Sequence, residues 1–122
     1  MFNKDKKLKE KNLLELIPVR RVGHEFKEDG TISLLIPRFK SKFLLNFLPK
    51  KKSPFVRINL DEYGTGFWQN LDDKRNVQEI GSIMREKFGD AIEPVFERLN
   101  IFIFQLRRQG FIELKDPKDE LK

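Results

Sequence analysis

Apolar residues in the first half of the chain form the short, partly alternating runs that are typical of β-strands. The runs at 22–27 and 31–37 flank Glu28-Asp29-Gly30, and a short loop ending in glycine between two such runs predicts a hairpin. A third run at 55–60 predicts another strand. Its inward-facing residues would be Phe55 or Val56, Ile58 and Leu60. The segment 12–18 predicts one helical turn, which Pro18 ends.

The second half of the chain repeats its apolar residues at helical spacing. The predicted helices span residues 61–71, 77–88 and 91–109. Asp61, Asn76 and Asp90 are the N-cap residues that we expect, and Glu79 completes a capping box with Asn76. A short strand at 111–114 follows Gly110, which ends the third helix.

The third predicted helix carries more apolar residues than one core face uses. Its core stripe, at about 100° per residue, consists of Ile92, Val95, Phe96, Leu99, Phe102, Ile103 and Leu106. Ile101 and Phe104 lie on the far side, in line with Arg108. Either the segments 13–17 or 43–48 cover them, or they line a groove for a partner. A self-complementary stripe in a homodimer is a further alternative.

The order of these elements predicts the α+β class. We expect a winged helix-turn-helix-like fold, in which an N-terminal three-stranded β element precedes three helices and a short C-terminal strand. The length of 122 residues fits one domain. We expect a flexible basic segment at 1–18, a domain at 19–114 with a basic insert at 38–54, and a mobile tail at 115–122.

Composition narrows the chemistry that the chain can perform. It has no cysteine and a single histidine, His24, so thiol nucleophiles and cysteine zinc sites are excluded. The close carboxylate pairs Glu28-Asp29 and Asp72-Asp73 both lie in predicted turns, where aspartate bonds to the backbone. We therefore expect no catalytic site, metal or cofactor. With no long apolar run and no secretory signal, we expect a cytoplasmic protein without a membrane partner.

The formal charge of +6 raises the possibility of nucleic-acid binding. Seven basic residues and no acidic residue lie between positions 38 and 57, which would suit phosphate groups. Residues 58–106 carry an acidic excess, however, and the third helix exposes apolar Ile101 and Phe104 where a DNA-reading helix needs polar side chains. A winged-helix nucleic-acid binder using the basic insert is the second interpretation, and we expect nucleic acid to be an unlikely partner.

Four stretches of the chain resemble the PqqD family, the coenzyme PQQ synthesis protein D group. They are Leu60-Asp61-Glu62-Tyr63-Gly64-Thr65-Gly66-Phe67-Trp68, then Asp72-Asp73-Lys74-Arg75-Asn76-Val77-Gln78-Glu79-Ile80, and then 102–106 with 110–112. The resemblance covers roughly residues 19–114. It implies a small non-catalytic domain, also called a RiPP recognition element, that holds the leader segment of a precursor peptide. Such a domain presents the peptide to a modifying enzyme, often a radical SAM protein.

The resemblance also implies where the peptide would bind. The family's groove lies between the third strand and the third helix, and an extended peptide adds to the strand edge. On this chain the corresponding residues are Phe55, Val56, Arg57, Ile58, Asn59, Ile101, Phe104, Gln105 and Arg108. Arg57 and Arg108 would favour an acidic leader. The family often has glycine where this chain has Asp73, and an insert at 38–53 that covered the groove would instead indicate assembly or regulation with a fixed partner.

Overall fold

A computed structural model describes residues 12–37 and 54–118, so the basic insert and both ends of the chain lie outside the described residues. The chain divides into two compact units. The strand unit is Val22–Thr65, and the helical unit combines Met1–Arg21 with Gly66–Lys122. The boundary falls within helix α3 (Glu62–Gln69). The α+β class is confirmed, whereas the winged-helix description stays a prediction.

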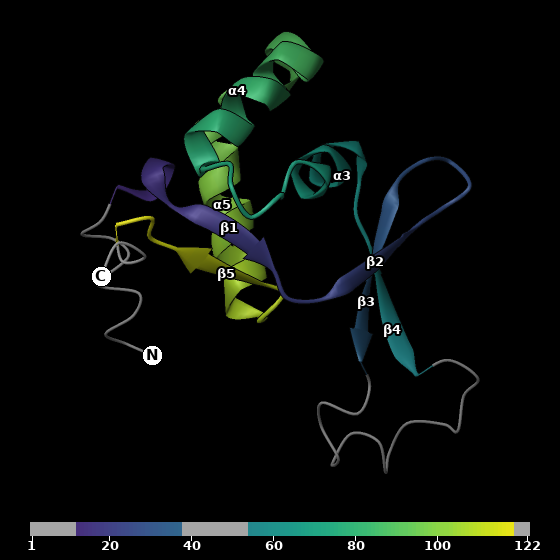
Figure 1. Cartoon of the computed structure of the whole chain (residues 1–122). Coiled ribbons are helices and arrows are strands. Elements are labelled where there is room, and N and C mark those ends of the chain that lie inside the picture. The colour runs from purple at the N-terminus through teal and green to yellow at the C-terminus, as the bar shows by residue number, and fades with distance from the viewer. Residues whose placement is uncertain (1–11, 38–53, 119–122) are drawn as a thin grey trace. The chain divides into compact units, whose positions relative to one another are not determined.

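The strand unit contains a three-stranded antiparallel sheet (Figure 1). Its strands are β2 (Gly23–Phe26), β3 (Ile32–Pro37) and β4 (Phe55–Asn59), in the order β2-β3-β4. Gly30 lies in the hairpin loop with φ of 88°, and the Asp29 side chain accepts a hydrogen bond from the Thr31 backbone N–H at 2.9 Å. The predicted hairpin and third strand are therefore confirmed.

A polar side chain ties α3 to this sheet inside the strand unit. The Thr65 hydroxyl accepts a hydrogen bond from the Ile32 backbone N–H at 2.9 Å, and Thr65 is buried. The Leu60 N–H donates to the Ile32 carbonyl at 2.8 Å, which continues the β3–β4 ladder by one residue. At the start of α3, the Asp61 carboxylate accepts from the Gly64 N–H at 2.8 Å, so the predicted cap is confirmed.

The helical unit brings the first and last strands of the chain together. The 3₁₀ helix η1 (Leu13–Glu15) leads into β1 (Ile17–Arg20), which pairs antiparallel with β5 (Ile112–Lys115). Figure 1 shows them side by side, one purple and the other yellow. The last strand was predicted from the sequence; β1 was not. In an antiparallel ladder, only alternate residues direct their backbone N–H toward the partner strand. The Arg21 N–H donates to the Phe111 carbonyl, so the backbone nitrogen of Pro18, three residues earlier, faces away from β5. Proline has no N–H, and it is tolerated at such a position.

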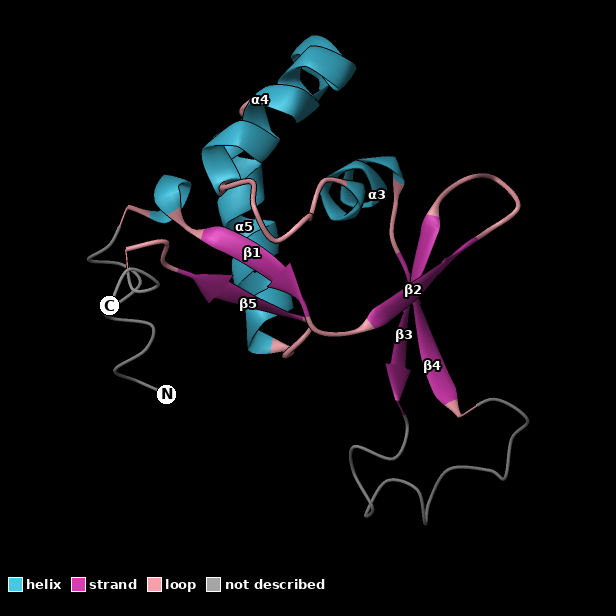
Figure 2. Ribbon diagram, viewed as in Figure 1, coloured by secondary structure: helices cyan, strands magenta, loops and turns pink. Residues whose placement is uncertain are grey.

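Two longer helices follow (Figure 2, cyan). Helix α4 (Val77–Phe88) begins with the predicted capping box between Asn76 and Glu79, and Gly89 ends it with φ of 62°. The predicted continuous helix from residue 91 is wrong. The chain instead forms the 3₁₀ helix η3 (Gly89–Ile92) and restarts as α5 (Val95–Arg108) after Pro94. Proline drives the preceding residue to extended angles and has no N–H, so the helix cannot run through position 94.

The core of the helical unit contains Phe67 and Trp68 from α3, both fully buried. The buried apolar residues of α4, η3 and α5 are Val77, Ile80, Met84, Ile92, Val95, Leu99, Ile103 and Leu106. Small residues allow close approach in two places. A Cβ at Gly81 would lie 2.4 Å from the Phe96 ring, and one at Gly66 would lie 3.0 Å from the Phe88 ring. Gly66 therefore lets α3 pack closely against the Phe88 ring.

Candidate functional site

Strand β4 lies at one edge of the three-stranded sheet, since among the described residues it pairs only with β3. All five strand residues expected in the peptide site, Phe55, Val56, Arg57, Ile58 and Asn59, therefore lie on an edge strand. Val56 and Ile58 are 40% and 37% exposed, although Ile58 was expected to turn inward. Leu60 lies on the same side of the strand and is buried, so the exposure of this side increases from Leu60 to Val56.

The pairing register gives β4 two chemically different faces. Residues opposite each other in the ladder share a face, and alternate residues share it along a strand. Val56 and Ile58 lie opposite Ile36 and Leu34, so one face is apolar. Arg57 lies on the other face, opposite Leu35.

The second face carries polar contacts that cross the sheet. The Arg57 guanidinium reaches back over β3 to form an ion pair with Glu25 of β2. The Ser33 hydroxyl, which is buried, donates a hydrogen bond to the Asn59 side-chain oxygen at 2.6 Å. The sequence pattern alone did not predict that Glu25 pairs with Arg57. The available signal was the alternation of His24, Glu25 and Phe26, which puts Glu25 on the Arg57 face once the register is known.

The other four expected site residues lie on α5, in the helical unit. Ile101 is 63% exposed, Gln105 and Arg108 are exposed, and Phe104 is half-buried. Their spacing of three, four and seven residues puts them on one side of the helix. Of the two segments that could have covered Ile101, η1 packs against α4, and 43–48 lies outside the described residues.

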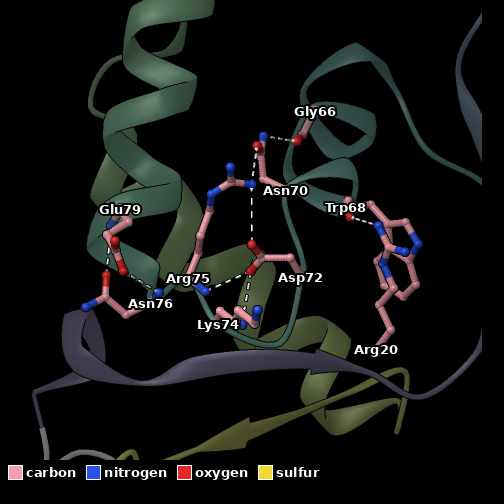
Figure 3. A network of polar contacts seen from close by, with 9 residues as sticks. All are labelled: Arg20, Gly66, Trp68, Asn70, Asp72, Lys74, Arg75, Asn76 and Glu79. Carbon is pink, nitrogen blue, oxygen red and sulfur yellow. Dashed lines mark hydrogen bonds and ion pairs between the residues drawn. The ribbon is translucent and has the colours of Figure 1, made fainter.

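The carboxylate pairs identified in the sequence lie in turns, as expected, where Asp29 and Asp72 accept hydrogen bonds from the backbone. Figure 3 shows the Asp72 carboxylate accepting hydrogen bonds from the backbone N–H groups of Lys74 and Arg75, at 3.0 and 2.8 Å. These bonds lower the pKa of Asp72. Within 12–37 and 54–118, no group of three or more potential ligands could hold a metal ion. Asp72 therefore shapes the turn between α3 and α4 and keeps its charge in doing so.

Arg20 of the helical unit contacts Trp68 at the end of α3 (Figure 3). The Arg20 guanidinium donates a hydrogen bond to the Trp68 carbonyl at 2.6 Å and lies 5.6 Å from the Trp68 ring centroid. Burial lowers the pKa of Arg20, and Asp73 opposes this effect through its charge. Arg20 thus anchors β1 to the end of α3.

Comparison with known proteins identifies the family that this region resembles. Residues 56–112 match the family model described as Coenzyme PQQ synthesis protein D (PqqD). The match contains Val56, Ile58 and every expected α5 residue, and it confirms the resemblance. PqqD proteins are non-catalytic accessory proteins of coenzyme PQQ synthesis. No curated protein and no solved structure gave a significant match. None of the helices in the described part of the chain has the length and apolar character needed to cross a membrane.

Proposed function

We propose, from the PqqD-family region at residues 56–112, that this protein is a non-catalytic adaptor for a precursor peptide. It holds the leader segment of that peptide in an extended conformation and presents it to a modifying enzyme, such as a radical SAM protein. The chemistry belongs to the enzyme. The adaptor supplies recognition, which requires an exposed surface and no reactive side chain.

The leader peptide adds to β4 as a further strand. In this mode, main-chain hydrogen bonds supply affinity, and contacts to alternate side chains supply selectivity. The edge position of β4 in the described sheet supports this assignment. So do the exposed side chains of Val56 and Ile58, because an added strand would place every second side chain on their face.

Helix α5, in the other unit, carries the remaining contact residues that we propose. Ile101 and Phe104 supply apolar contacts, Gln105 can hydrogen-bond, and Arg108 attracts an acidic residue of the leader. One observation carries the proposal: Val56, Ile58 and Ile101 are all apolar, exposed and inside the family match. Val56 and Ile58 recur on one face of an edge strand, which is typical of a strand that pairs with a further strand.

A peptide selection with matched variants tests this function. Short peptides selected from a random library on the wild-type protein are measured against Ile101→Asp, and against Gln78→Asp as a control on an exposed position of α4. Ile101→Asp should weaken peptide binding by about tenfold, because the apolar contact is lost, and the Gln78→Asp control should bind like wild type. Because the contact is apolar, this difference should persist at high salt.

Two binding results would contradict the proposal. One is equal peptide affinity for Ile101→Asp and wild type. The other is preferential binding of duplex DNA that weakens steeply with salt and ignores the substitution at Ile101, which indicates a nucleic-acid binder. Light scattering on the same samples addresses self-association, since a wild-type dimer that Ile101→Asp dissociates would assign this surface to a second copy.

A further inference from the structure

We infer that Glu25 is a specificity-determining residue of the peptide site, because it neutralises Arg57 and prevents β4 from selecting an acidic guest. This inference rests on the proposed strand addition to β4. It concerns a residue on β2, a strand that has no direct contact with a peptide added beside β4. It also reverses the expectation that Arg57 draws acidic leaders.

The faces of the sheet define which guest residue is affected. A guest strand beside β4 alternates its side chains in the same way as β4 does. The guest residue opposite Arg57 therefore shares the face of Arg57 and Glu25, and its two neighbours share the apolar face of Val56 and Ile58. Only one guest position lies opposite residue Arg57 in the register, so a single substitution in the peptide can probe it.

The charge on this face is already balanced within the sheet. Glu25 and Arg57 are the only Asp, Glu, Lys or Arg residues in β2, β3 and β4. Their ion pair spans β3 and directs the guanidinium toward β2, away from the outer edge where a guest would lie. An acidic guest side chain must compete with Glu25 for Arg57, so it gains little over a neutral one.

The size of the effect follows from the exposure of the pair. The side chains of Arg57 and Glu25 are 47% and 43% exposed, so solvent screens their attraction. Exposed ion pairs contribute little, and losing one changes an equilibrium by about two- to fivefold. Removing the Glu25 charge should therefore increase the preference for an acidic guest by about two- to fivefold. Removing Arg57 as well should abolish that increase.

The experiment compares wild type, Glu25→Gln and the double variant Glu25→Gln/Arg57→Gln. The probes are peptides selected from the random library on wild type, each synthesised with either glutamine or glutamate at successive positions. The measured quantity is the ratio of the glutamate-peptide to the glutamine-peptide association constant. We expect a ratio near one for wild type, a ratio of about two to five for Glu25→Gln at one peptide position, and a return toward one in the double variant.

The outcomes separate this inference from the function on which it rests. Equal ratios in all three proteins, with binding still weakened by Ile101→Asp, would overturn the role of Glu25 and leave the adaptor function standing. A wild-type protein that already prefers glutamate opposite Arg57, and does so equally without Glu25, would also overturn it. Peptide binding that ignores Ile101→Asp would remove the adaptor function and this inference together.

Discussion

Adding one methyl group at Gly81 tests the packing of α4 against α5. In most helix interiors, replacing glycine by alanine stabilises the fold by about 1 kcal/mol, because glycine loses more backbone entropy on folding. At Gly81 the new Cβ would lie 2.4 Å from Cε1 and 2.9 Å from Cζ of Phe96. Both distances are far below van der Waals contact, so the Phe96 ring must move.

Its neighbours restrict that movement. The Arg85 guanidinium lies 5.2 Å from the Phe96 ring centroid, and an ion pair with Glu93 at 2.6 Å holds Arg85. Overpacking of this kind costs about 1–3 kcal/mol, and the upper part of that range applies to so short a contact. After the helix-propensity gain is subtracted, Gly81→Ala should lower the free energy of unfolding by about 1–2 kcal/mol.

Urea unfolding followed by Trp68 fluorescence measures this change, since Trp68 is the only tryptophan and is fully buried in the helical unit. With a urea slope of about 1–3 kcal/mol per M, the midpoint should fall by about 1 M. The control is the same substitution in a Phe96→Leu background, where the clash is removed. There, Gly81→Ala should stabilise by up to about 1 kcal/mol. Stabilisation of the wild-type background by Gly81→Ala would refute the reasoning.

Three further predictions concern the turns and caps. Asp73 has φ of 66°, which suits glycine, so Asp73→Gly should raise the free energy of unfolding by about 1 kcal/mol in the same urea assay; a loss would contradict this. Asn76→Ala removes half of the capping box with Glu79 and should lower the free energy of unfolding by about 1 kcal/mol, whereas an unchanged urea midpoint would count against the cap. Hydrogen bonding to Arg85 lowers the pKa of Glu93, so this carboxylate stabilises the fold above its ordinary pKa of 4.5, and the contribution disappears as the pH falls through the depressed folded-state value. Glu93→Gln should therefore flatten the acid side of a stability–pH profile, and an unchanged profile would exclude this role.

Local patterns predicted the elements whose causes are local. The hairpin around Gly30 and the Asn76–Glu79 capping box both depend on residues within a few positions of one another. Strand β1 is different, because its partner β5 lies at the other end of the chain. Pro18 was interpreted as the end of a helical turn, and only the pairing register shows that its missing N–H faces away from β5.

The candidate site was predictable to a similar extent. Helical periodicity separated Ile101 from the core face of the third helix, and Ile101 is exposed. The pairing of Arg57 with Glu25 could not be predicted, because it crosses a strand and depends on the register between β2, β3 and β4. The break at Pro94 could have been predicted, since a proline inside an apolar helical pattern ends or kinks the helix.

The most direct test of the account locates the guest peptide on the protein by NMR. Uniformly labelled protein is titrated with a library-selected peptide, and intermolecular proton contacts are recorded. Cross-strand backbone contacts between the peptide and β4, together with side-chain contacts at Ile101 and Phe104, are the predicted result. Contacts confined to the β2 edge, or a bound peptide without extended backbone contacts to β4, would contradict strand addition.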